Sequence, residues 1–145
     1  MKKHSLTVSC AAAAALVMGS AAVFAAGLPP ERQSGGVTYV TGGVSDEESS
    51  LFKQARMDYP LSIELVQKAG AHNAFTADAR VKVTDSAGNV VLDAKADGPF
   101  MLVRLPAGNY RVEATLNGRS VGTKPVTVGT KGSAQAMLVF PQGTD

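Results

Sequence analysis

Cysteine, histidine and tryptophan are scarce in this sequence of 145 residues. Cys10 is the only cysteine, His4 and His72 are the two histidines, and tryptophan is absent. A lone cysteine excludes a disulfide within the chain, so packing alone must stabilise the fold. The 14 basic and 12 acidic residues nearly balance, and 45% of the residues are hydrophobic. This composition excludes a collagen-like repeat, a long disordered tail and a protein with many membrane spans.

The first 25 residues have the order of a secretory signal peptide. Lys2 and Lys3 precede an apolar stretch from Leu6 to about Met18, and small residues then lead to Ala25. This order of charge, apolar run and small residues predicts cleavage after residue 25. We therefore expect a bacterial protein that is periplasmic or secreted.

Two alternatives concern the same segment. Residues 5–26 are just long enough to span a bilayer as an uncleaved anchor, although their alanine and serine make them weakly hydrophobic. Cys10 lies before most of the apolar run, so it does not fit the cysteine of a lipoprotein signal. Loss of Lys2 and Lys3 lowers the 14 basic residues to 12, equal to the 12 acidic ones. We therefore expect a neutral mature protein without a membrane span and without a basic surface for nucleic acid.

Residues 26–45 are rich in glycine and proline, which predicts a flexible leader with one short strand at 37–40. The pairs Gly35-Gly36 and Gly42-Gly43 invite comparison with a phosphate-binding loop. That motif also needs a Lys followed by Ser or Thr after a strand, and this context is missing. The glycine pairs therefore indicate turns.

Residues 46–58 are predicted to form one short helix. Ser45 is placed to accept a hydrogen bond from the amide of residue 48, and Glu48 to reach back, as in a capping box. An apolar face follows over residues 51–55, and Pro60 ends the helix. The three acidic residues of the first turn also raise the possibility of a cation site, but capping and the helix dipole explain them without a metal.

Residues 59–141 alternate between short strands and turns. Polar and apolar residues alternate with a period of two, which is typical of strands with one buried and one wet face. This alternation covers residues 61–65, 80–84, 90–96 and 110–116. Residues 100–105 and 134–140 are more uniformly apolar and are expected to be central, whereas Pro125 makes 121–128 an edge or bulged strand. Seven such strands predict an all-β sandwich or a small barrel.

The turns between these strands carry a resemblance to a known family. The pattern consists of Asp85-Ser86-Ala87-Gly88, Asp97-Gly98-Pro99-Phe100, Leu105-Pro106-Ala107-Gly108-Asn109-Tyr110-Arg111-Val112 and Asn117-Gly118. It resembles the carboxypeptidase regulatory-like domain, in which a D-G-x-F turn is followed by an L-P-x-G-x-Y-x-V element. Small secreted bacterial proteins with a Gly-Gly and acidic segment before such a domain are similar over residues 42–48. The resemblance implies a seven-stranded antiparallel transthyretin-like β-sandwich at 59–141, preceded by the short helix.

Seven turn residues are expected to be critical for the fold and not for chemistry. Pro106 fixes φ at the start of its turn, and Gly108 is expected to relieve a strained position. Tyr110 is expected to bury its ring and to hydrogen-bond its hydroxyl at the edge. The complete set is Asp97, Gly98, Pro106, Gly108, Tyr110, Asn117 and Gly118.

No residue is assigned to catalysis, to a cofactor or to a metal. His72 is expected in an exposed loop, and the acid pair Asp93 and Asp97 is more simply surface charge. Copper binding by His72 with Met57, Met101 and Met137 would need soft ligands that converge, and these are scattered in the sequence. Hydroxyisourate hydrolases share the transthyretin-like fold but end in Tyr-Arg-Gly-Ser, which this chain lacks.

The leading functional hypothesis is a non-enzymatic binding or accessory module, with a protein, a peptide or a glycan as its partner. Its candidate contact regions are the Pro125 strand edge and the segment 35–44. One alternative is a carrier or sensor of a small apolar ligand, acting as a monomer or a dimer. The other is a cryptic hydrolase that uses His72, Asp93 and Asp97.

Overall fold

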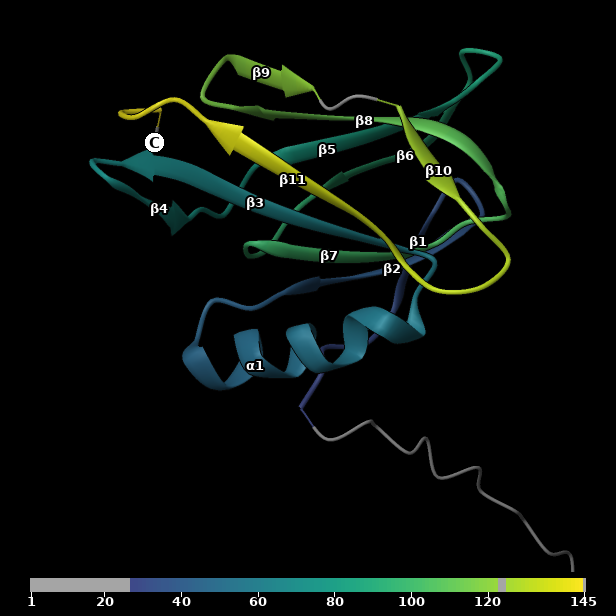
Figure 1. Cartoon of the computed structure of the whole chain (residues 1–145), viewed down its shortest axis with the longest axis horizontal. Coiled ribbons are helices and arrows are strands. Elements are labelled where there is room, and N and C mark those ends of the chain that lie inside the picture. Colours follow the sequence, from purple (N-terminus) through teal and green to yellow (C-terminus); the bar gives the residue numbers. More distant parts are fainter. Residues whose placement is uncertain (1–26, 123–124, 145) are drawn as a thin grey trace, which may run out of the picture.

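Two facing β-sheets and one helix make up residues 27–122 and 125–144, the part of the chain that the computed structural model describes (Figure 1). The predicted signal peptide lies outside these residues. Within them, no helix is both long enough and apolar enough to cross a membrane. The observed sandwich agrees with the predicted all-β class with one short helix.

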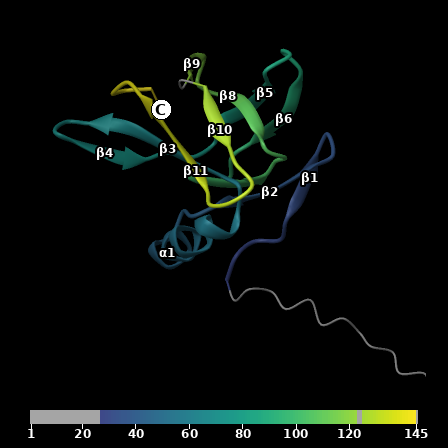
Figure 2. The same ribbon diagram turned by 45° about the vertical axis from the view of Figure 1, so that its right-hand side comes forward.

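Sheet A contains six strands. Its path is β1 (Arg32–Ser34), β2 (Val37–Gly42), β7 (Phe100–Arg104), β3 (Leu61–Ala69) and β11 (Ala134–Phe140), and β4 (His72–Phe75) extends β3 as a hairpin. This hairpin projects from one end of the molecule (Figure 2). Strands β3 and β11 run parallel, with Ile63 opposite Ala136, whereas the other neighbours in this sheet are antiparallel.

Sheet B contains five strands. Its path is β10 (Val126–Val128), β8 (Gly108–Leu116), β5 (Arg80–Asp85) and β6 (Val90–Lys95), and β9 (Arg119–Gly122) pairs with the second half of β8. Every pairing in this sheet is antiparallel. Ser34 on β1 bridges the two sheets at one side, because its Oγ donates to the carbonyl oxygen of Asp93 on β6 at 3.2 Å.

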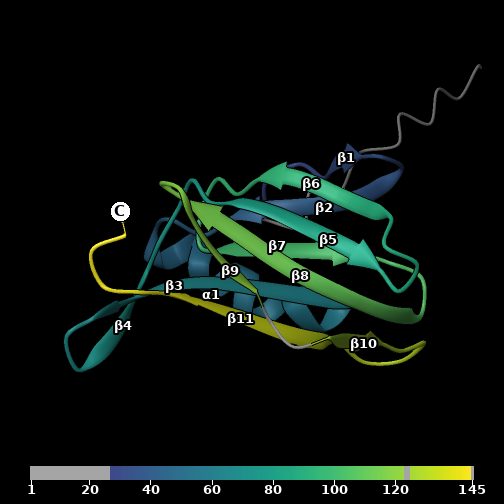
Figure 3. The same ribbon diagram turned by 90° about the horizontal axis from the view of Figure 1, so that it is seen from above.

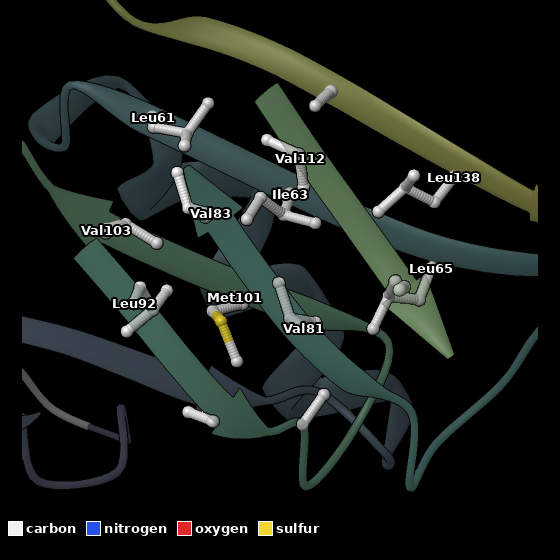
Figure 4. Close-up of a cluster of buried hydrophobic side chains, with 14 of the residues drawn as sticks. Leu61, Ile63, Leu65, Val81, Val83, Leu92, Met101, Val103, Val112 and Leu138 are labelled. Atoms are coloured by element: carbon white, nitrogen blue, oxygen red, sulfur yellow. The ribbon is translucent and has the colours of Figure 1, made fainter. Parts of the chain in front are cut away.

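The main core lies between the two sheets, where the inward residues of the alternating strands meet. Figure 4 shows these side chains pointing toward one another from both sheets. Alternation explains the arrangement, since every second residue of a strand faces the same side. The members with essentially no exposed surface include Leu61, Ile63, Leu65, Val81, Val83, Leu92, Met101, Val103, Val112 and Leu138.

A second core covers the outer face of sheet A beneath α1 (Asp46–Ala55), which continues as a 3₁₀ turn (Arg56–Asp58). Phe52 on the helix stacks on Phe100 of β7, with the ring centroids 5.7 Å apart. Leu102 on β7 and Val40 on β2 are buried in the same cluster. Strand β7 is therefore buried on both faces, which is the physical reason for its uniformly apolar sequence.

Ser45 and Glu48 hold the beginning of α1. The Oγ of Ser45 accepts from the amide of Glu48 at 3.1 Å, as a helix cap requires. The carboxylate of Glu48 does not reach back to residue 45. Its Oε1 accepts instead from the amide of Gly43 at 2.6 Å, and so links the helix to the end of β2.

The strand inventory corrects the sequence prediction in several places. The described residues form eleven strands and not seven, and the sandwich is not wholly antiparallel. Strand β11 lies at an edge of sheet A instead of at its centre. The stretch 121–128 holds parts of two strands, β9 and β10, and His72 begins strand β4 where a loop was expected.

Strand β2 confirms the short strand predicted at 37–40, whereas β1 was not predicted, and both lie in the segment predicted to be a flexible leader. The sandwich therefore extends further toward the N-terminus than the predicted boundary at residue 59. Arg32 on β1 forms an ion pair with Asp97 on the β6–β7 connection, with Nη2 2.6 Å from Oδ2.

Candidate functional site

Three connections converge at one end of the sandwich. They are the β1–β2 turn at Gly35-Gly36, the β5–β6 loop at 86–89 and the β7–β8 turn at 105–107. All three lie at the right-hand end in Figures 1 and 3, opposite the β3–β4 hairpin. Connections that a rigid sheet holds in place are common positions for binding residues.

Two adjacent hollows open between these connections. Each has a volume of about 410 Å³. Both are lined by Asp85 at the end of β5 and by Tyr110 near the start of β8, so the two hollows adjoin at these residues. Their size is at the lower end of the range of ligand sites.

The first hollow combines polar side chains with a mostly apolar exposed surface. Its lining consists of Thr84, Asp85, Ser86, Gly88, Asn109, Tyr110, Arg111 and Pro125. Arg111 is exposed, and no described residue forms an ion pair with it. Asn109 already uses its side-chain oxygen, which accepts from the hydroxyl of Thr127 at 2.9 Å, so its amide nitrogen is left to donate.

The second hollow has polar and apolar surface in similar amounts. Its lining consists of Gly35, Gly36, Val37, Asp85, Val90, Val91, Arg104, Leu105, Pro106 and Tyr110. Val90 in this lining is 53% exposed. This hollow can therefore contact polar as well as apolar groups.

Tyr110 supports the floor of both hollows. Its ring is buried, and its hydroxyl donates to the carbonyl oxygen of Pro106 at 2.8 Å, which ties β8 to the turn that precedes it. Gly108 within that turn has no positive φ, so the expectation that it relieves a strained backbone is wrong. A Cβ atom at Gly108 would lie 3.5 Å from the Tyr110 ring, an ordinary contact distance.

The carboxylate of Asp85 is used within its own loop. Its Oδ1 accepts from the amides of Ala87 at 3.0 Å and Asn89 at 2.9 Å, and its Oδ2 accepts from the Asn89 side chain at 3.4 Å. These bonds hold the β5–β6 loop in one shape. Among the residues that the structure describes, Arg111 therefore presents a charged group at the first hollow that forms no ion pair.

Arg104 beside the second hollow is engaged as well. Its Nη2 lies 3.3 Å from Oε1 of Glu31, and its guanidinium carbon is 4.3 Å from the centre of the Tyr59 ring. The Tyr59 hydroxyl donates to the same Glu31 oxygen at 2.7 Å. Burial, followed by this bond, raises the pKa of Tyr59 to about 12, and the bond lowers the pKa of Glu31.

The candidate contact regions from the sequence partly meet here. Pro125 lines the first hollow and Gly35-Gly36 the second, whereas Gly42 and Gly43 lie at the opposite end of β2. Arg111 and Asn109 did not stand out in the sequence. The available signal was their position on either side of Tyr110, at the outward-facing places of an alternating strand.

The remaining turn residues lie at the other end of the sandwich. Asn117 and Gly118 both have positive φ, 48° and 82°, and form the tight β8–β9 turn. Gly98 packs so closely on Gly42 that a Cβ atom would overlap the Gly42 backbone. Asp97 donates its amide to Oγ1 of Thr41 at 3.2 Å. These residues shape the fold and do not line the hollows.

The residues considered for catalysis or copper are not assembled into one site. Within residues 27–122 and 125–144, no group of three or more His, Cys, Asp and Glu is placed to hold a metal ion. Met101 is buried in the main core, whereas Met57 and Met137 are exposed. His72 lies at the tip of the β3–β4 hairpin.

Comparisons of the chain with models of protein families, with curated proteins and with solved structures gave no match.

Proposed function

We propose that the protein is a non-enzymatic binding or accessory module, and that it acts in the periplasm or outside the cell. The paired hollows around Tyr110 are the observation that carries this proposal. They combine hydrogen-bonding groups with an apolar surface on connections anchored by a rigid sandwich, which is the composition of a recognition site. A protein, peptide or glycan partner would approach this end of the molecule.

The proposed location rests on the sequence of the first 25 residues. Its test is the mass of the protein recovered from the periplasm or the medium of an expressing bacterium. The expected N-terminus is Ala26. Recovery of the intact chain from the membrane fraction would favour the uncleaved anchor and contradict this part of the proposal.

We also propose that the sandwich is of the transthyretin-like kind found in carboxypeptidase regulatory-like domains. The matching turns support this. The hydrogen bond from the Tyr110 hydroxyl to the Pro106 carbonyl oxygen links the proline and the tyrosine of the L-P-x-G-x-Y element. The additional strands, including β1 and β4, are then elaborations of a smaller sandwich. A solved structure with a different sheet order would contradict the assignment.

Photo-crosslinking tests whether the hollows bind a partner. A photoreactive amino acid in place of Ser86, which lines the first hollow, should capture a discrete partner in the producing cell. The control position is Ser120, an exposed serine on β9. Its hydroxyl forms a hydrogen bond with the Thr115 hydroxyl, and it does not line either hollow. Equal capture from both positions, or none from residue 86, would contradict the proposed site.

One observation favours the second candidate, a carrier of a small apolar ligand. Phe75 is 47% exposed and Met137 is 53% exposed, and both face outward from sheet A beside the buried Val66. A fluorescent apolar dye distinguishes the two candidates. Dye binding that is lost in Met137→Lys but kept in Arg111→Gln would support the carrier.

A further inference from the structure

Residues 28–34, which we call the strap, are attached to the sandwich mainly by polar contacts. None of these seven residues is buried. At the beginning of the strap, Leu28 packs against the core beneath α1. At its end, the Ser34 hydroxyl donates to the carbonyl oxygen of Asp93 on β6 at 3.2 Å. The strap therefore runs from the outer face of sheet A to an edge of sheet B, and Leu28 is its one aliphatic side chain apart from two prolines.

The backbone pairing of the strap is short. Only its last three residues, which form β1, pair with β2, although β2 is six residues long. Pro29 and Pro30 come shortly before β1, and proline has no N–H group with which to extend a ladder. Pro29 still lies close to the end of β2, since its Cγ would be 3.3 Å from a Cβ atom at Gly42. The segment before β1 thus approaches β2 without pairing to it.

Two charged residues of the strap make further contacts. Oε1 of Glu31 accepts from the Tyr59 hydroxyl at 2.7 Å and lies 3.3 Å from Nη2 of Arg104, and Arg32 pairs with Asp97. The charged side chains of the two ion pairs are between 41% and 51% exposed. Water and salt screen ion pairs at such exposure, so each pair holds the strap only weakly.

Strand β2 is held far more firmly on its other side. It pairs there with β7 over five residues, from Thr38 opposite Arg104 to Gly42 opposite Phe100. Val40 in the middle of this stretch is fully buried beneath α1. Segments with few buried apolar contacts open locally at a lower free energy than the core of the same protein. The two edges of β2 should therefore differ in how often their hydrogen bonds break.

We propose that the strap opens as a unit about Gly35-Gly36 while the remaining strands stay paired. Both glycines are exposed and have positive φ, 59° and 85°, so this turn can change shape at little steric cost. Opening uncovers the outer edge of β2 and separates Glu31 from Arg104. Because Arg104 lines the second hollow, its guanidinium is released there from its carboxylate partner.

Amide hydrogen exchange of the mature protein, followed by NMR, tests the opening on a single strand. The two-residue turn makes Ser34 and Val37 a hydrogen-bonded pair, so the amides of Val37 and Tyr39 point toward β1. The amides of the alternate residues Thr38 and Val40 point toward β7. After correction for intrinsic rates, Tyr39 should exchange about tenfold or more faster than Val40. Its exchange should also depend less on urea, because a local opening exposes little surface.

A variant of the main core separates local opening from unfolding of the whole sandwich. Val81 on β5 is fully buried between the sheets, so Val81→Ala should make exchange at Val40 about tenfold or more faster. Exchange at Tyr39 should keep the rate of the parent, because opening of the strap leaves the contacts of Val81 intact.

A variant of the strap should act on the opening itself. Glu31→Gln removes the ion pair with Arg104, so exchange at Tyr39 should become about two- to fivefold faster. The matched control is Glu47→Gln on α1, because Glu47 is exposed and forms no ion pair with a described residue. It should leave exchange at Tyr39 unchanged.

Three results would overturn the proposed opening. They are equal exchange rates at Tyr39 and Val40 in the parent, equal acceleration of both amides in Val81→Ala, and no change at Tyr39 in Glu31→Gln. The first two would mean that the strap separates only when the sandwich unfolds, and the third that Glu31 does not hold it. Crosslinking from residue 86 does not depend on these rates, so the proposed binding function stands or fails separately.

Discussion

The outer faces of the two sheets differ sharply. Sheet A buries Val40, Phe100 and Leu102 on its outer side beneath α1, whereas sheet B presents charged and polar residues to solvent. The outer residues of sheet B include Arg80, Lys82, Asp93, Glu113 and Thr115. The helix is thus explained by the second apolar face of β2 and β7, because an uncovered face of that kind would be unstable in water.

A substitution at the centre of the apolar outer face of sheet A, which α1 covers, should have the largest effect on stability. Phe52 is fully buried and stacks on Phe100, so Phe52→Ala should lower the free energy of unfolding by about 3–5 kcal/mol. Lys82→Ala on the outer face of sheet B is the comparison, and should change it by less than about 0.5 kcal/mol. Urea denaturation measures both. Similar values for the two variants would mean that α1 contributes little to the fold.

The next largest effect on stability is expected where Gly98, just before β7, packs on Gly42 at the end of β2. A Cβ atom at Gly98 would overlap the backbone of Gly42, and a backbone atom cannot move aside as a side chain can. Gly98→Ala should therefore lower the free energy of unfolding by about 1–3 kcal/mol. Gly122→Ala in sheet B is the control, since its nearest neighbour would be 3.9 Å away. Equal stability of the two variants would contradict the close packing.

The same contrast explains what the sequence could predict. Strands of sheet B such as β5 and β8 alternate strictly, because one face is wet, and they were found where alternation placed them. The helix was indicated by Ser45 and by its apolar face. In β7, the loss of alternation correctly indicated a strand buried on both sides.

The errors have physical causes too. Strands β1 and β4 are short, polar and largely exposed, so no apolar pattern marks them. Strand β11 is mostly apolar like β7, but its outward Met137 faces solvent at a sheet edge. Its parallel pairing with β3 joins segments about 70 residues apart, which local patterns do not encode.

The candidate site was harder to predict than the fold. Pro125 and Gly35 could be chosen as contact regions because proline and glycine mark exposed turns. Arg111 and Asn109 have the composition of any wet strand face. Only the three-dimensional meeting of three connections distinguishes Arg111 from the exposed Arg119.

The contact between Tyr59 and Glu31, at the margin of the covered face, should make stability depend on pH. The pKa of Tyr59 is raised to about 12 in the folded protein, first by burial and then by the bond to Glu31. Its contribution is complete below its ordinary pKa of about 10 and is lost as the pH rises toward 12. The lowered pKa of Glu31 has the opposite sign, so its contribution is present above the ordinary value of 4.5 and is lost in acid.

Tyr59→Phe tests both effects. At pH 7 it should lower the free energy of unfolding by about 0.5–1.5 kcal/mol through loss of the hydrogen bond. It should also remove the decline in stability above pH 10 that Tyr59 causes, and reduce the decline below pH 4.5. Denaturation at a series of pH values provides the measurement. A variant with the same alkaline decline as the parent would show that another group is responsible.

The smallest effect is expected for the ion pair on the outer face of sheet B. Arg80 Nε lies 2.8 Å from Asp93 Oδ1, but the two side chains are 62% and 39% exposed. Water and salt screen such a pair, so a double-mutant cycle of Arg80→Ala and Asp93→Ala should give a coupling of about 0.2–1 kcal/mol. The coupling should shrink further at 1 M salt. A value above about 2 kcal/mol that persists in salt would place this pair in a desolvated environment, and the contrast between a packed outer face and a solvated one would then no longer hold.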